Sequence, residues 1–413
     1  MSLEHQRHPL SCGATVLARP LAANDIVSIR AFLPMGCLYE TDAEAGISRM
    51  VQNLLPRGTG SRTAHEIQDA LGELGADLDT GAGVDLGSAS LRATSATWED
   101  ALEILLDVLT GAVFPEEEVE TEIERTLGEI EAREDQLMTR AMDLFREEFY
   151  GGHPAHKPVI GYRDTVSELD HEAVAAAARR FYRPVPRVIV AVGRFDPDTL
   201  VEKLDAAFGR TPLAPPPERP AAPAPRAGTR RLEVERDAAY LVHGYPAPSY
   251  GDADYPAARV VDAILGGSMA SRLFVELREK RSLAYQVSSL YDDRLDGSYL
   301  AGYIVTDPDR AAEAAEGLER EFRRLAEEPV GEDEIERARR HLRGRFLIGA
   351  ETNAAQGSRL GQYESYGLGQ DFGDRWQAAL DAVTPEALGA FARRRFAGEA
   401  TRALVVPGGA AVA

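Results

Sequence analysis

Three polar residues, Arg49, Gln52 and Asn53, stand at the spacing of a metal site. They occupy positions i, i+3 and i+4 of a stretch, 46–55, whose apolar residues recur at helical spacing and which ends at Pro56. Histidine, glutamate and histidine at this spacing hold one zinc ion and supply the carboxylate that activates its water. A guanidinium cannot bind zinc, a carboxamide is a poor ligand, and Gln52 cannot accept a proton. The stretch therefore has the outline of a hydrolytic zinc site without its chemistry.

The surroundings of this motif resemble the pitrilysin and mitochondrial-processing-peptidase superfamily. The matching features are Gly46, the segment 55–59, and the pair Glu122 and Glu129, which lies where that family keeps its third zinc ligand. The resemblance implies an α+β fold of two similar domains that together form half of a clam-shell chamber. It also implies a non-catalytic subunit, with no zinc in this chain and the zinc in a partner chain.

A carboxylate that remains in a zinc pocket after its co-ligands are lost needs another cation. Arg49 stands where the first imidazole would be, so we expect an ion pair between Arg49 and Glu129, with or without Glu122, that replaces the zinc electrostatically. The pair would lock together the two helices that carry these residues. The alternative is that Arg49 points to solvent, because Arg259, its counterpart in the internal repeat, has no evident acidic partner.

A second pair, Arg278 and Tyr285, lies in the stretch 266–287 at the seven-residue spacing of an arginine and a tyrosine in that family. The resemblance implies that this guanidinium and phenol bind the carbonyl of a peptide substrate and stabilise the oxyanion beside a partner's zinc. The alternative is that Arg278 makes a surface ion pair with Glu276 or Glu279 and that Tyr285 belongs to the core.

The chain divides near its middle at segment 211–228, where seven prolines in eighteen residues predict an extended linker. On either side the sequence repeats itself: residues 42–55 are echoed by 252–265 at an offset of 210. We therefore predict an N-terminal domain at 1–210 and a C-terminal domain at 229–413, each an antiparallel sheet with helices packed on one face.

Hydrophobic periodicity predicts the elements that carry these residues. The expected strands cover 13–17, 26–32, 86–93 and 188–192, and the first two are expected to be antiparallel. The expected helices cover 46–55, 64–75, 98–109, 116–134, 141–149 and 171–182.

A chain of 413 residues suits two domains, and a net charge of −21 argues against nucleic acid as a partner. The excess acid would favour basic peptides if it lined a cavity, although a solvated acidic surface explains it as well. The sequence contains no apolar run of the roughly 18 to 20 residues that a membrane helix needs, and it shows no secretory signal. We expect a cytoplasmic protein with no membrane partner.

Two hypotheses for function follow. In the first, the chain is the substrate-binding subunit of a heterodimeric zinc endopeptidase that degrades or processes peptides. A catalytic subunit of similar size, with an intact motif, would then supply the zinc and the general base. In the second, the chain is a structural or peptide-holding scaffold without a catalytic role, and it pairs with itself when alone.

Overall fold

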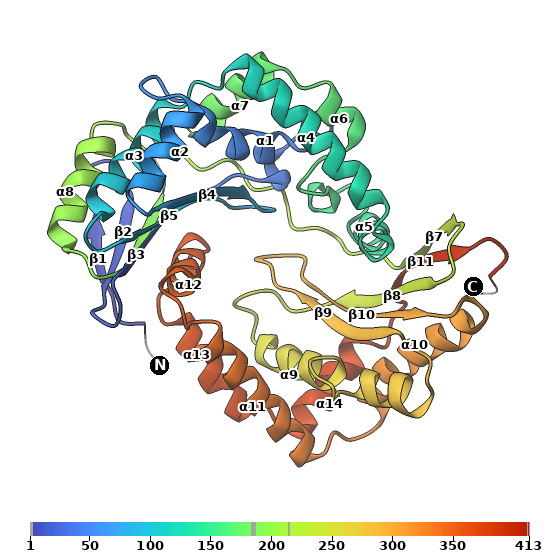
Figure 1. The fold of residues 1–413 in the computed structure, drawn as a ribbon. Helices are drawn as coiled ribbons and strands as arrows, with labels where there is room; N and C mark the ends of the chain where they lie inside the picture. The colour runs from blue at the N-terminus through green and yellow to red at the C-terminus, as the bar shows by residue number, and fades with distance from the viewer. Residues whose placement is uncertain (1–2, 183–186, 214, 411, 413) are drawn as a thin grey trace. The chain divides into compact units, whose positions relative to one another are not determined.

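The computed structural model describes residues 3–182, 187–213, 215–410 and 412, which form two compact units (Figure 1). Unit 1 contains the residues up to Glu131, then Lys157–Pro220 and Ile348–Asp371. Unit 2 contains Ala132–His156, Ala221–Leu347 and the residues from Phe372 onward. Each unit has one sheet with packed helices, which confirms the predicted α+β class.

The sheet of unit 1 has six strands in the order β1-β2-β6-β3-β5-β4. Its strands are β1 Gln6–Pro9, β2 Thr15–Pro20, β3 Ile26–Leu33, β4 Asp77–Ala82, β5 Gly87–Thr94 and β6 Val188–Gly193. Its helices are α1 Ile47–Leu54, α2 Ala64–Glu73, α3 Trp98–Gly111, most of α4 Glu116–Glu134, α6 Arg163–Ser167, α7 His171–Tyr182, α8 Pro197–Phe208 and α12 Asn353–Ser365.

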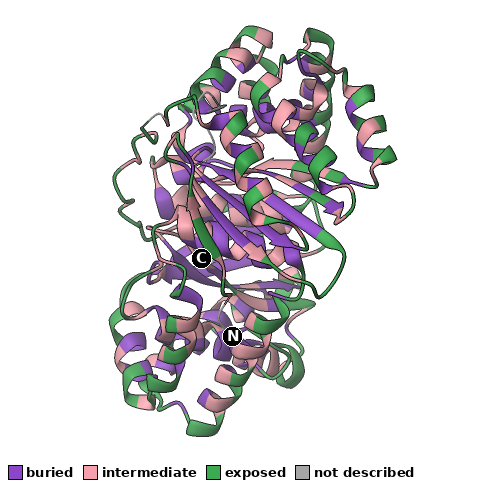
Figure 2. Ribbon diagram, turned by 90° about the vertical axis from the view of Figure 1, so that its left-hand side faces the viewer, coloured by how far each residue is buried: buried purple, intermediate pink, exposed green. Residues whose placement is uncertain are grey.

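Both faces of this sheet are apolar, because side chains alternate along each strand. Ile29 and Ala191 belong to the large core beneath α1, α3 and α7, whereas Phe32 and Val190 face the opposite way and pack with Leu360 of α12. Figure 2 shows the buried residues concentrated along the strands and on one side of each helix. Helices therefore cover both faces of the six-stranded sheet, where we expected helices on one face.

The sheet of unit 2 has five strands in the order β7-β11-β8-β10-β9. Its strands are β7 Gly228–Val234, β8 Ala239–Pro246, β9 Gln286–Asp292, β10 Tyr299–Thr306 and β11 Thr401–Pro407. Its helices are α5 Leu137–Tyr150, α9 Tyr255–Leu265, α10 Ala311–Glu327, most of α11 Glu332–Ile348, α13 Phe372–Ala379 and α14 Pro385–Arg395, with a π-helical segment at Phe274–Lys280.

The two units share one topology, because β2-β6-β3-β5-β4 and β7-β11-β8-β10-β9 visit their strands in the same relative order. They also exchange one helix each. Helix α5 comes from the first half of the chain and packs on the sheet of unit 2, and α12 comes from the second half and packs on the sheet of unit 1. The described residues of segment 215–227, between the halves, adopt neither helix nor strand.

The sheets are mixed and not purely antiparallel, since β2 pairs with β6 and β7 with β11 in parallel. Strands β2 and β3 run in opposite directions, as expected, but β6 lies between them. The predicted helices and strands are present with shifted ends, whereas β1, β4, α6 and α8 in the first half of the chain were not predicted. Among the described residues, no helix combines the length and the apolar character needed to cross a bilayer.

Candidate functional site

Helix α1 carries the three motif residues, and its first turn is fixed by a buried carboxylate. Gly46 at its N-cap has φ +101°, and a Cβ there would lie 2.8 Å from the carbonyl oxygen of Ile160, so only glycine fits. The Glu40 carboxylate accepts the backbone N–H groups of Gly46 and Ser48 at 3.0 and 2.8 Å. A negative charge at a helix N-terminus stabilises the otherwise unpaired amides there.

Glu40 is itself buried beside a second charged residue. Burial raises the pKa of its carboxyl group, and the two backbone N–H groups and nearby Lys157 oppose that rise. The Lys157 ammonium is buried, donates to the backbone carbonyl of Glu40 and lies 3.5 Å from Asp42. Sequence analysis missed Glu40 and Lys157, which fix the start of α1 although neither belongs to the motif.

Arg49 and Asn53 lie one helical turn apart and both contact α4. The Arg49 guanidinium makes an ion pair with Glu129 at 2.5 Å, and the Asn53 amide donates to Glu122 at 2.7 Å. The expected ion pair between Arg49 and Glu129 is thus confirmed. Arg49 does not contact Glu122, because Asn53 and a further arginine occupy that carboxylate.

That further arginine is Arg125, one turn along α4. It donates to Glu122 at 2.5 and 2.8 Å, and it also donates to Glu129. These charge-assisted bonds raise the pKa of Arg125, and the bond to Glu122 has the largest effect. Its position three residues after Glu122 and four before Glu129 is the spacing of helical ion pairs, so the sequence contained the signal that would have identified it.

The spacing i, i+3 and i+4 predicts one shared helix face, but Gln52 does not lie on the face of Arg49 and Asn53. Its side chain is fully buried, and its amide lies 3.0 Å from the sulfur of Met35, on the sheet side of α1. The carbonyl oxygen of this amide has no hydrogen-bond partner in the part of the chain that the structure describes. The position that would carry the general base therefore packs into the core.

The motif is less buried than a closed metal pocket would be. The side chains of Arg49 and Glu129 are 22% and 37% exposed, whereas that of Glu122 is 3% exposed. No three His, Cys, Asp or Glu side chains among the described residues are arranged to hold one metal ion. Both carboxylates already bind nitrogen donors, and a guanidinium occupies the first ligand position, so these residues do not fit a zinc ion.

Arg259, at the corresponding position of unit 2, does have an acidic partner, which corrects our expectation. Its guanidinium lies 2.6 Å from Asp293, just after β9, and over the ring of Tyr291 at 5.1 Å. Burial raises the pKa of the Asp293 carboxyl group to about 6, although the positive charge of Arg259 opposes the rise.

The second pair, Arg278 and Tyr285, belongs to unit 2. Arg278 is exposed within the π-helical segment, and its guanidinium stacks on Phe274 at 5.1 Å. It makes no ion pair with the described acidic residues; Glu276 instead binds Lys280 at 2.7 Å. Tyr285 is 62% exposed and so is not a core residue. The alternative drawn from the sequence, an ion pair for Arg278 and a core position for Tyr285, is therefore wrong in both parts.

The backbone fixes the position of Tyr285 even though its side chain is exposed. Ser282 has φ +49°, so the chain turns sharply between the π-helical segment and β9. The Tyr285 N–H then donates to the carbonyl of Val305 on the neighbouring β10 at 2.8 Å. A phenol held in this way is free to bind a ligand, and π-helical segments are frequent at functional sites.

Two α+β units that repeat one strand order define the class of fold. Residues 15–163 match the family model described as "Insulinase (Peptidase family M16)", and residues 168–342 match "Peptidase M16 inactive domain". The chain belongs to the M16 peptidase family, which includes insulinase and pitrilysin.

Curated relatives that match over nearly the whole chain support this assignment. An uncharacterized zinc protease of Streptomyces coelicolor is 30% identical over 398 residues, which cover 94% of this chain and 86% of the relative. An uncharacterized zinc protease of Mycobacterium tuberculosis is 29% identical over 402 residues, which cover 95% and 91% of the two chains.

Solved structures share the fold. The peptidase M16 inactive domain from Pseudomonas fluorescens superposes with a TM-score of 0.89 at 22% identity and covers 99% of both chains. A protease from Helicobacter pylori superposes with a TM-score of 0.90 at 18% identity, covering 98% of this chain and all of the other.

Proposed function

We propose that this chain is the non-catalytic, substrate-binding subunit of a two-chain M16 zinc endopeptidase. The observation that carries the proposal is the ion pair between Arg49 and Glu129, which places a guanidinium against the carboxylate expected to be a zinc ligand. A partner chain of similar size, with an intact His-x-x-Glu-His motif, would supply the zinc and the general base.

In this proposal Arg278 and Tyr285 bind the peptide. A guanidinium and a phenol are strong donors to a carbonyl oxygen, and they bind it more strongly as negative charge develops there. Neither side chain is used in a hydrogen bond or ion pair with the other described residues, and both are exposed. This availability supports a ligand-binding role over a structural one.

The test is reconstitution with an M16 chain that keeps the intact motif, followed by peptide-cleavage kinetics. Arg278→Ala and Tyr285→Phe should each weaken transition-state binding by about 2 to 4 kcal/mol, mostly in kcat. Arg340→Ala is the matched control, because Arg340 is an exposed helical arginine with only a weak ion pair to Glu336 at 3.9 Å. Unchanged kinetics of both variants in an assembled complex would remove Arg278 and Tyr285 from the site.

The second candidate is a structural or peptide-holding scaffold that forms homodimers. The two candidates differ in the partner of this chain, so the discriminating measurement is the oligomeric state of the chain alone and with the catalytic chain. A stable homodimer that excludes the catalytic chain, and that binds peptides without cleaving them, would favour the scaffold.

A further inference from the structure

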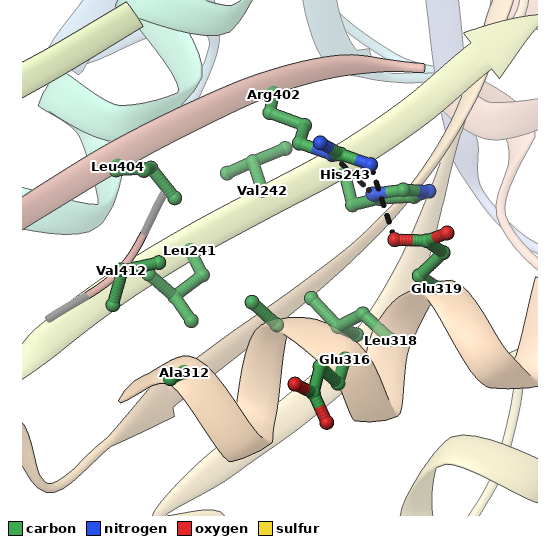
Figure 3. Close-up of a pocket in the computed structure, with 11 residues that line it drawn as sticks. Leu241, Val242, His243, Ala312, Glu316, Leu318, Glu319, Arg402, Leu404 and Val412 are labelled. Atoms are coloured by element: carbon green, nitrogen blue, oxygen red, sulfur yellow. Dashed lines mark hydrogen bonds and ion pairs between the residues drawn. The ribbon is translucent and has the colours of Figure 1, made fainter. Parts of the chain in front are cut away.

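Unit 2 contains a cavity of about 270 Å³ between α10 and strands β8 and β11 (Figure 3). It opens on the face of the sheet opposite α5. Side chains alternate along β8, and a Cβ at Gly244 would meet Phe145 of α5, so His243 and Leu241 point the other way, toward α10. The lining of the cavity includes no residue of α1 and none of the segment that carries Arg278.

The floor of the cavity consists of two cross-strand pairs with different chemistry. Leu241 pairs with Leu404, and His243 pairs with Arg402. The pairs are two residues apart along the strands, which separates an apolar end from a polar end by about 7 Å. The opposite wall is one stripe of α10, with small residues beside the apolar pair and acids beyond them: Ala312, Ala315, Glu316 and Glu319.

The polar end carries an arginine with spare donors. The Arg402 guanidinium binds Glu319 at 3.1 Å and donates through Nε to His243 Nδ1 at 3.4 Å. Glu319 also binds Arg323 at 2.6 Å, so one carboxylate is shared by two cations. The Nη1 group of Arg402 makes no hydrogen bond to any described residue. Burial, and then the charge of Arg402, lower the pKa of His243 to about 3, so the imidazole is neutral and adds no charge.

The apolar end already accommodates an aliphatic side chain. Val412 lines the cavity and is buried there. Its segment returns to the sheet because Arg231 binds the carbonyls of Val412 and Ala410 at 2.7 and 2.8 Å. Val412 lies in neither a helix nor a strand.

We propose that this cavity binds a short aliphatic monocarboxylate, with its carboxylate on Arg402 and its hydrocarbon chain between the Leu241–Leu404 pair and α10. An arginine with an unused Nη1 donor at one end and an apolar wall about 7 Å away match this class of ligand. A free fatty acid and the apolar C-terminal residue of a peptide share this chemistry.

The test is calorimetric titration of the full chain with three six-carbon probes: hexanoate, hexylamine and hexanol. Hexanoate should bind at least about tenfold more tightly than hexanol, since a charged hydrogen bond contributes that much, and hexylamine should not bind. Arg402→Met should weaken the binding of hexanoate by at least about tenfold. Arg323→Met is the control, because it removes the other cation on Glu319 without touching the cavity, and it should leave hexanoate binding within about twofold.

Ala315→Leu fills the cavity and should abolish hexanoate binding in a folded chain, so the proposal stays testable if Arg402→Met does not fold. A tripeptide that ends in leucine, compared with its amidated form, separates the two sources: tighter binding of the free acid supports peptide C-termini, and binding of hexanoate alone supports fatty acids. Equal binding of all three six-carbon probes, or full binding by Arg402→Met, would overturn the proposal.

Discussion

The charged residues that join α1 and α4 differ in how much each contributes to the stability of the fold. Arg49 and Glu129 are the positions that attract attention in the sequence, but Glu122 is the buried carboxylate, with its side chain 3% exposed. Arg125 donates twice to Glu122 and also binds Glu129, so removing Arg125 leaves a buried carboxylate with two neutral donors, the Asn53 amide and the Thr126 hydroxyl. Removing Arg49 leaves Glu129 still paired with Arg125.

Arg125→Met should therefore lower the free energy of unfolding by about 3 kcal/mol, the scale of a buried charge that loses its partner. Arg49→Met should lower it by about 1 kcal/mol, since its pair is partly exposed and Glu129 keeps a second cation. Breaking a fully buried pair would cost about 3 to 5 kcal/mol. The exposure of 22% and 37% for Arg49 and Glu129 is the reason for the smaller value.

Urea denaturation at pH 7 measures these differences. Combining Arg125→Met with Glu122→Gln should restore part of the lost stability, because no buried charge is then stranded. Arg163→Met is the control, since its pair with Glu131 is 3.7 Å long and exposed, and it should change stability by less than about 0.5 kcal/mol. A loss for Arg49→Met as large as that for Arg125→Met, or strictly additive losses in the double variant, would refute this reasoning.

Two further predictions concern metal and pH. The purified chain should contain no stoichiometric zinc by elemental analysis, because the ligand positions carry Arg49 and Asn53; one zinc per chain that disappears on Glu129→Gln would contradict this. Burial lowers the pKa of His243 to about 3, whereas an unfolded histidine titrates near 6.5, so the unfolded state binds the extra proton between these values. Stability should therefore fall as pH is lowered from about 6.5 toward 3, and His243→Phe should flatten that fall in urea titrations, whereas His65→Gln, at an exposed histidine, should not.

The long periodic elements were predictable from sequence, and the polar or non-local features were not. Helix 46–55 corresponds closely to α1, and strand 188–192 to β6, because each has a strong apolar pattern. Strand β4, with the sequence DLDTGA, was missed because an edge strand buries few apolar side chains. The insertion of β6 between β2 and β3 depends on contacts that are distant in sequence, which periodicity does not encode.

The candidate site shows the same division. The ion pair between Arg49 and Glu129 followed from charge logic across two predicted helices, and Arg125 was recoverable from its spacing. The burial of Gln52 could not be predicted from the sequence, because it depends on how α1 is rotated against Met35 and β5. Lys157 binds the backbone of Glu40 from more than one hundred residues away, and the sequence carries no local signal for such a contact.

The internal repeat also limits the role that can be assigned to Arg49. Arg49 and Arg259 occupy the same position of the repeated unit, and each makes an ion pair, at 2.5 and 2.6 Å. Their partners come from different elements, Glu129 from α4 and Asp293 from the end of β9. A role limited to replacing zinc would not explain Arg259, because the zinc-motif resemblance is confined to the first half. An arginine at this position fastens α1, and α9 in the repeat, to a neighbouring element, so the proposed substrate-binding function rests on Arg278 and Tyr285 more than on the degenerate motif.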